Sequence, residues 1–175
     1  MDTGNDWFNL RFPTADIPHW AARYDAAYDA GIAALAPAAR GRGHLTYDEL
    51  LALGRWHSPR IGRHLAANDS TYVEAVTAAA LSTPSERLRL AVLTLLSGVG
   101  WPMASVILHW CHADPYPILD FRALWSLGLD PLPRYDFALW QAYTDHCREL
   151  AAAASVSMRE LDRALWQYSK EKQVR

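Results

Sequence analysis

A short glycine-containing turn between two apolar helical patterns constrains the fold of this chain more than any other feature. The turn is Gly98-Val99-Gly100, and it separates the helical pattern of 86–96 from that of 101–111. Glycine adopts positive φ at little cost, so the chain can reverse tightly here. The amides of the turn and of the following helix start are unpaired donors at a positive dipole end. We therefore expect a helical hairpin that can hold a phosphate oxygen, with Val99 pointing inward.

Helical patterns extend over almost the whole chain of 175 residues, and no run alternates convincingly with a period of two. Apolar residues at three- and four-residue steps predict a helix over 15–35, which Pro37 and a loop at 40–43 end. In 86–96 we expect Leu88, Val92 and Leu95 or Leu96 to face inward. Capping signals and periodicity predict the other helices: 46–56, a short one from Ser58, 69–81, 101–111, 120–127, 134–152 and 157–170. The sequence thus predicts an all-α protein.

The net charge of the chain argues against a dedicated nucleic-acid binder, but the distribution of charged residues along the sequence does not. The formal net charge is −2, whereas DNA-binding domains usually have a strong positive balance. Residues 40–64 contain five arginines and two acidic residues, a net charge of +3, which leaves −5 for the rest. A local basic face can follow a phosphate backbone, and Arg60 and Arg63 are candidates for DNA contact opposite the hairpin. A solvated helix face is an equally good interpretation.

Composition also limits the class of protein and its cellular location. No apolar run approaches the length of a membrane span, and the first residues lack the basic and apolar regions of a signal peptide. Two cysteines do not make a disulfide or metal framework, and His109 and His112 lack the further ligands of a zinc site. We expect a cytoplasmic protein without metal, cofactor or membrane partner. The oligomeric state stays open.

Two segments together resemble a known family. Residues 96–104 read Leu-Ser-Gly-Val-Gly-Trp-Pro-Met-Ala, and residues 115–120 read Pro-Tyr-Pro-Ile-Leu-Asp. They resemble the Leu-Pro-Gly-Val-Gly-x-x-x-Ala hairpin and the later catalytic aspartate of the helix-hairpin-helix base-excision DNA glycosylases. The resemblance covers about residues 86–128 and implies two helical lobes around a cleft that receives a base. One lobe would comprise about 44–128, with the hairpin at 86–111, and the other about 1–38 with 130–175.

The resemblance also implies how the hairpin binds double-stranded DNA. The candidate DNA-binding residues of the hairpin are Ser97, Gly98, Val99, Gly100, Trp101 and Ser105. Backbone amides would bind the phosphate, and the two serines would add hydroxyl donors. A tight interhelical turn without a ligand is the alternative interpretation. All eight tryptophans are by default core residues, and Trp101 is the best candidate for stacking on a base.

Asp120 is the candidate catalytic residue. Its carboxylate would stabilise the positive charge that develops on the sugar as a base leaves, and would orient or deprotonate a water. The alternative interpretation is a helix N-cap, since aspartate before an apolar helix accepts bonds from free amides. The two roles are compatible. Arg122 would contact phosphate, or would pair with Asp120 and leave it structural.

One departure from the family limits the chemistry. Members that also cut the strand use a lysine in the second hairpin helix, which forms a Schiff base with the sugar. The matching position is Pro102, and no lysine precedes Lys170. The sequence therefore predicts a monofunctional DNA glycosylase without strand cleavage. The alternative is a non-catalytic helix-hairpin-helix module that binds DNA or a protein.

Overall fold

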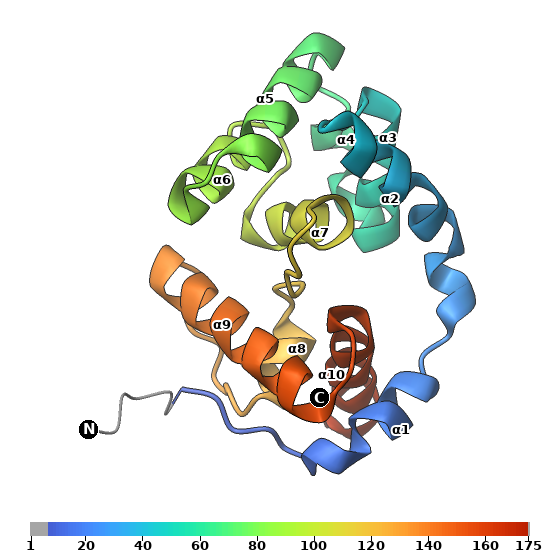
Figure 1. Cartoon of the computed structure of the whole chain (residues 1–175), viewed down its shortest axis with the longest axis vertical. Helices are drawn as coiled ribbons and strands as arrows, with labels where there is room; N and C mark the ends of the chain where they lie inside the picture. The colour runs from blue at the N-terminus through green and yellow to red at the C-terminus, as the bar shows by residue number, and fades with distance from the viewer. Residues whose placement is uncertain (1–6, 175) are drawn as a thin grey trace. The chain divides into compact units, whose positions relative to one another are not determined.

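The computed structural model describes residues 7–174, which form ten α-helices and three short 3-10 helices without any strand (Figure 1). The prediction of an all-α protein is confirmed. The described residues divide into two units. The terminal unit contains the residues up to Asp25 and those from Pro115 onward, and the central unit is Ala26–Asp114. Within residues 7–174, no helix combines the length and apolar character needed to traverse a bilayer.

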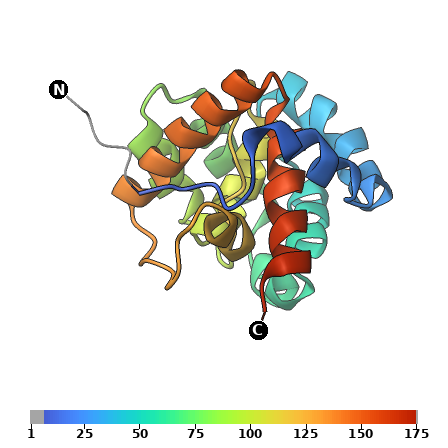
Figure 2. The ribbon, with the colours of Figure 1, turned by 90° about the horizontal axis from the view of Figure 1, so that it is seen from below.

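The terminal unit is built around its last helix. Its elements are η1 (Thr14–Asp16), α1 (Ile17–Ala22), α8 (Phe121–Ser126), α9 (Phe137–Ala154) and α10 (Met158–Lys172). α10 packs against α1 and α8, and Figure 2 shows α1 alongside α10. The Ser126 hydroxyl donates to the Leu165 carbonyl (2.6 Å), and the Asn9 amide donates to the Leu127 carbonyl (2.7 Å). The first bond joins α8 to α10, and the second joins the N-terminal segment to the end of α8.

The central unit surrounds its most apolar helix. It contains η2 (Ala26–Asp29), α2 (Ala30–Arg42), α3 (Tyr47–His57), η3 (Pro59–Ile61), α4 (Gly62–Leu65), α5 (Ser70–Ser82), α6 (Glu86–Leu93) and α7 (Trp101–Cys111). Seven of the eleven residues of α7 are buried, and α2, α3 and α6 pack against this helix. α5 in turn packs on α6. The hairpin of α6 and α7 therefore lies wholly within the central unit (Figure 1).

Local capping chemistry accounts for most of the correct helix starts. Thr46 opens α3 and Ser157 opens α10, each through a reciprocal capping box with a glutamate three residues later. Asp69 caps α5 and Asp120 caps α8 through side-chain oxygens that accept backbone amides. Such caps satisfy amides that have no partner within the helix.

The first predicted helix is wrong. The stretch 15–35 is divided among η1, α1, η2 and the start of α2, and the break falls at the boundary between the two units. Ile17 and Ile32 are both buried, but each in a different unit, and Tyr28 between them is 59% exposed. The apolar spacing that suggested one helix therefore serves two separate cores.

Pro37 does not end a helix, contrary to prediction. It lies inside α2, which continues through the expected loop to Arg42 and stops at Gly43 with φ of 81°. Proline removes one helical hydrogen bond. Burial of Ile32, Ala36 and Ala39, on a helix that packs against α7, favours the continuous helix nonetheless.

The inward face of α6 also differs from prediction. Its buried residues are Arg89, Leu90 and Leu93, whereas Leu88 is 50% exposed and Val92 is half-buried. Of the alternatives Leu95 and Leu96, Leu96 is buried as predicted and Leu95 is 60% exposed. Ser85 caps α6 by accepting the Leu88 amide (3.3 Å), and Thr83 is the C-cap residue of α5. The helix stops at Leu93, because the next amides bond three residues back and tighten the chain before the hairpin turn.

The sequence boundaries of the two units differ from the lobe boundaries that the resemblance implied. The lobe boundaries were expected near 38–44 and 128–130, whereas the units change at 25–26 and 114–115. α8 joins the terminal unit because it packs on α10, and α2 joins the central unit because it packs on α7. As a result, Asp120 belongs to the terminal unit and the hairpin to the central unit.

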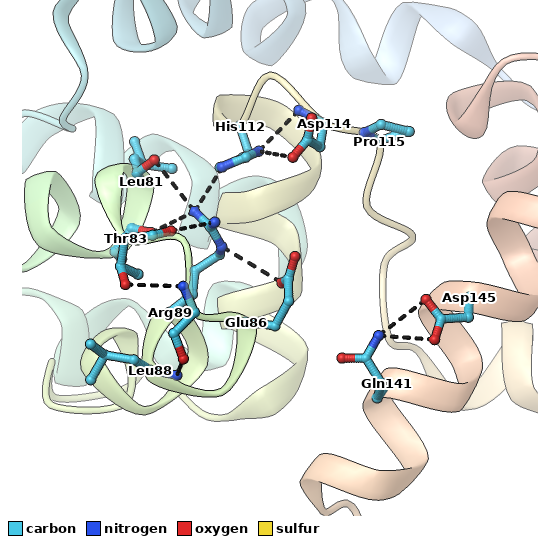
Figure 3. A network of polar contacts seen from close by, with 12 residues as sticks. Leu81, Thr83, Glu86, Leu88, Arg89, His112, Asp114, Pro115, Gln141 and Asp145 are labelled. Carbon is cyan, nitrogen blue, oxygen red and sulfur yellow. Dashed lines mark hydrogen bonds and ion pairs between the residues drawn. The ribbon is translucent and has the colours of Figure 1, made fainter.

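A buried arginine joins three helices of the central unit (Figure 3). Nη1 of Arg89 donates to the carbonyls of Ala80 (2.8 Å) and Leu81 (3.3 Å) at the end of α5, and Nη2 donates to the Thr83 carbonyl (2.6 Å). Nη1 also lies 2.7 Å from Nε2 of His112, just after α7. Since guanidinium only donates, Nε2 is the acceptor. This network satisfies helix-end carbonyls that α5 leaves open.

Replacement of Arg89 by methionine is expected to destabilise the protein by about 2–4 kcal/mol, because buried carbonyls lose their donors. Chemical unfolding monitored by circular dichroism measures this loss. Arg87→Met, at an exposed position of the same helix, serves as the control and should change stability by less than about 0.5 kcal/mol. Equal stability of the two variants would contradict the structural role of Arg89.

Candidate nucleic-acid interface

The hairpin turn runs from the end of α6 to Gly100, which is the N-cap residue of α7. Gly98 has φ of 82°, in the region that favours glycine. Val99 is buried, as predicted, and its amide donates to the Leu96 carbonyl (3.1 Å). Pro102 lies in the first turn of α7, where a missing amide costs no helical bond.

A side chain from another segment fixes the Ser97 peptide. The Asn68 amide group receives a bond from the Ser97 amide (2.8 Å) and donates to the Ser97 carbonyl (2.9 Å). Its nitrogen also donates to the Leu65 carbonyl (2.9 Å). Asn68 therefore connects the end of α4 to the hairpin turn.

Gly98 lies directly against α4. A Cβ atom at this position would stand 2.9 Å from Cβ of His64 and 3.0 Å from the Leu65 amide nitrogen. Only a residue without a side chain allows this approach. The contact brings the basic segment 55–64 beside the hairpin turn within one unit.

The segment 55–64, to which this contact belongs, carries three exposed arginines. Arg55, Arg60, Arg63 and His64 are all exposed, with Arg63 next to His64 on α4. Within residues 7–174, the three arginines form no ion pair. Glu49 of α3 forms an ion pair with Arg42. Burial alone would raise the pKa of Glu49, but its bonds with Thr46 and Arg42 outweigh burial and lower it, so this carboxylate stays charged and compensated.

The turn also retains donors. In the part of the chain that the structure describes, the amides of Gly98, Gly100 and Trp101 donate no hydrogen bond, and Gly100 makes no side-chain cap. Gly100 is exposed and Trp101 half-buried. We call the turn 97–101, of which Ser97 and Gly100 are exposed, together with Arg60, Arg63 and His64 the hairpin surface.

Ser105 does not belong to the hairpin surface. The residue is fully buried inside the central unit, and its hydroxyl donates to the Pro102 carbonyl (2.6 Å). The prediction that it offers a hydroxyl to a phosphate is corrected, because residue 105 is on the side of α7 that faces the core. Ser97 is exposed, as a contact residue requires.

Asp120 caps α8 from a half-buried position. Its Oδ1 accepts the Arg122 amide (2.7 Å), so its role as N-cap is confirmed. Burial, and then the nearby Asp120 charge, raises the pKa of Tyr135. The buried Tyr143 hydroxyl donates to the Ile118 carbonyl (2.8 Å), and burial raises its pKa well above the usual value. Asp120 thus has tyrosines as neighbours in the terminal unit, and its catalytic role stays a prediction.

The Arg122 side chain lies over aromatic rings. Its guanidinium carbon is 5.2 Å from the ring centre of Phe121 and 5.4 Å from that of Trp166. Trp166 belongs to α10, so the Arg122 side chain connects α8 to α10. The expectation that all eight tryptophans lie in the core is not met. Trp140 is buried, Trp7 is exposed and the other six are half-buried.

The cysteines are not suited to nucleophilic chemistry. Both are buried, and burial raises the pKa of Cys111 to about 12 and that of Cys147 further. The thiolate is the reactive form, and it is disfavoured at neutral pH. His112 contacts Arg89 through Nε2, and its Nδ1, which carries the proton of the neutral ring when Nε2 accepts, lies 3.7 Å from a carboxylate oxygen of Asp114.

Comparison of the chain with protein-family models, with curated proteins and with solved structures found no match. The likeness to glycosylases therefore depends on the residues of the hairpin and of the segment before Asp120.

Substitution of Gly98 by alanine is expected to cost about 2–4 kcal/mol, because positive φ and overpacking against α4 both oppose a Cβ atom. Gly100→Ala is the matched control. Residue 100 has φ of −94°, and its Cβ would meet nothing closer than Pro102 at 3.9 Å. Thermal unfolding of the two variants measures the difference, and a Gly98→Ala protein as stable as the control would refute the close contact.

Proposed function

We propose that this protein binds double-stranded DNA through the hairpin surface. The observation that carries the proposal is the contact of Gly98 with His64 and Leu65. Because of this contact, exposed arginines and unbonded turn amides occur on the same part of the central unit. Amides at a helix start bind phosphate oxygens, and arginines neutralise the neighbouring phosphates.

The net charge of −2 is compatible with this proposal. Exposed charges act over roughly a Debye length, about 8 Å at physiological salt, so local charge matters more than the total. Within the basic segment, Glu49 pairs with Arg42 near Cys111, at the end of α7 away from the turn, so this pair leaves the charge of Arg60 and Arg63 unchanged. The hairpin surface would therefore meet a phosphate backbone as a positive patch.

We further propose that the protein hydrolyses the N-glycosidic bond of a damaged or modified base. The bond between base and sugar breaks, the sugar becomes positively charged, and the Asp120 carboxylate stabilises that charge. Water then attacks the sugar carbon and leaves an abasic site. Support comes from the hairpin-to-aspartate spacing and from the half-buried position of a carboxylate that its helix holds in place. Without a lysine in the hairpin helix, strand cleavage through a Schiff base is not proposed.

A second candidate is a non-catalytic DNA-binding module. The bond from the Arg122 amide to Asp120 favours it, because helix capping alone is a sufficient reason for an aspartate at this position. Both candidate functions bind DNA through the hairpin surface. Measurement of base release distinguishes them, because only a glycosylase releases a base.

Binding to a labelled duplex is expected to fall steeply with salt, and the double variant Arg60→Gln/Arg63→Gln should reduce the slope of log affinity against log salt by about 1.8. Fluorescence anisotropy measures the slope. Arg40→Gln is a control: Arg40 acts on Cys111 at the far end of α7, about 16 Å along that helix from the turn. An unchanged slope in the double variant would rule out these contacts.

The turn is tested in the same titration with Gly100→Asp. Aspartate is a good N-cap residue, so the variant should be at least as stable as the parent, yet its charge would repel a phosphate. We expect affinity to drop at least about tenfold, whereas Gly100→Asn, a neutral cap of the same shape, should lose much less. Equal affinities of the two variants would exclude phosphate from the turn.

Asp120→Asn is expected to lower base release by about 10²-fold or more while DNA affinity and stability persist. Asparagine caps helices about as well as aspartate, so the variant isolates the charge. Modified duplexes are incubated with each protein and then cleaved at abasic sites with heat or alkali. Equal activity would remove Asp120 from catalysis, and DNA binding without release by the parent would favour the non-catalytic module.

A further inference from the structure

Helix α6 carries a second apolar stripe on the side that does not face the core. Leu88 and Leu95 are both largely exposed, and they are seven residues apart, which is about two helical turns. Ala91, which is exposed, and Val92, which is half-buried, lie between them on the same side. Figure 3 shows the Leu88 side chain directed away from the Arg89 guanidinium. We call Leu88, Ala91, Val92 and Leu95 the α6 stripe.

The α6 stripe concentrates exposed aliphatic surface in one place. Within residues 7–174, three leucines are largely exposed, and two of them belong to the stripe; the third is Leu132 of the terminal unit. Tyr72, which is 44% exposed, adds to this surface from α5, the helix that packs on α6. Single exposed apolar residues are ordinary, but contiguous ones mark a surface that binds a partner.

The chemistry of the stripe favours a protein partner over nucleic acid. Interfaces with DNA are polar and strongly positive, whereas the four side chains of the stripe carry neither charge nor a hydrogen-bonding group. The buried centre of a protein–protein interface has this character, because charged residues are depleted there. Contact through the stripe therefore desolvates no ion.

The order of residues along the stripe is self-complementary. Consider two copies of α6 packed antiparallel, with a two-fold axis that passes between residues 91 and 92. Residues equally far from that axis then lie opposite each other, so Leu88 of one copy faces Leu95 of the second copy. Ala91 faces Val92 in the same way, and its small side chain leaves room for the larger one. A two-fold interface requires such a patch, which is complementary to itself.

Backbone electrostatics favour the same arrangement. A helix is positive at its N-terminal end and negative at its C-terminal end. The antiparallel pair places opposite ends of the two α6 helices side by side, so their dipoles attract each other. A second copy of this chain thus matches the stripe in both side-chain order and charge.

The area of the stripe limits the strength of such a contact. Four side chains and Tyr72 form a patch no larger than the roughly 300–600 Å² that a typical monomer exposes. A stable interface buries about 800 Å² per partner, and smaller ones are transient. The area therefore fits a weak, reversible association rather than a permanent one.

We infer that the α6 stripe is the contact surface of a weak, two-fold symmetric dimer, in which α6 of one copy packs antiparallel on α6 of a second copy. The inference goes beyond the proposed function and does not depend on DNA binding. It assigns the oligomeric state, which the sequence left open. One dimer contains two hairpin surfaces.

The test exchanges the charges of the stripe in full-length proteins and measures their association by sedimentation velocity. The parent is expected to change from monomer towards dimer between about 10 µM and about 1 mM. Leu88→Glu/Leu95→Glu and Leu88→Lys/Leu95→Lys each place like charges opposite each other, so the Kd should rise at least about tenfold in both. An equimolar mixture of the two variants places opposite charges together and should associate at least as well as the parent.

The matched controls are Leu132→Glu and Leu132→Lys, at a position of the terminal unit that is 45% exposed, and both should associate like the parent. A parent that stays monomeric at about 1 mM overturns the inference. So does unchanged association of the two double variants, or a mixture of folded variants that remains monomeric. Absence of duplex binding by a dimeric parent leaves the inference intact and overturns only the proposed function.

A crosslink tests the register of the two helices without charge changes. Residue 91 lies beside the proposed axis, so Ala91→Cys should form a disulfide-linked dimer in oxidised glutathione, because the two thiols come within bonding reach. Ala152→Cys, at an exposed position of α9, is the control and should crosslink much less. The two native cysteines are buried. Equal crosslinking of the two variants would contradict the contact of α6 with its copy.

Discussion

The contact between the hairpin turn and α4 is the constraint on which the candidate interface depends. Gly98 approaches His64 and Leu65 so closely that no side chain fits, and Asn68 holds the neighbouring Ser97 peptide from both sides. Without this contact the basic segment and the turn would be unrelated features of the central unit. With it, a segment with exposed arginines lies against a turn with open amides, and phosphate oxygens bind to both kinds of group.

The exposed arginines of the hairpin surface, Arg60 and Arg63, make no ion pair among the described residues. Elsewhere the balance is different, since Arg42 and Arg23 pair with glutamates. A chain of net charge −2 can thus present local positive surfaces.

Features governed by neighbours in sequence were predictable. The caps at Thr46, Asp69, Asp120 and Ser157 need only a side chain and the amides that follow, so their patterns were read correctly. The inward face of α6 was not predictable in this way, because apolar residues lie on two sides of that helix. The side that is buried carries Arg89, whose guanidinium donates to carbonyls of α5.

The sequence by itself determined the helical class, the capped helix starts at Thr46, Asp69, Asp120 and Ser157, and the glycine turn, because each follows from backbone preferences and hydrogen bonds within a few residues. Tertiary structure alone decided that α4 lies against Gly98, that Ser105 is buried, and that Asp120 and the hairpin belong to different units. Those outcomes depend on which apolar faces pack together, and helical periodicity alone does not specify the partner of a face.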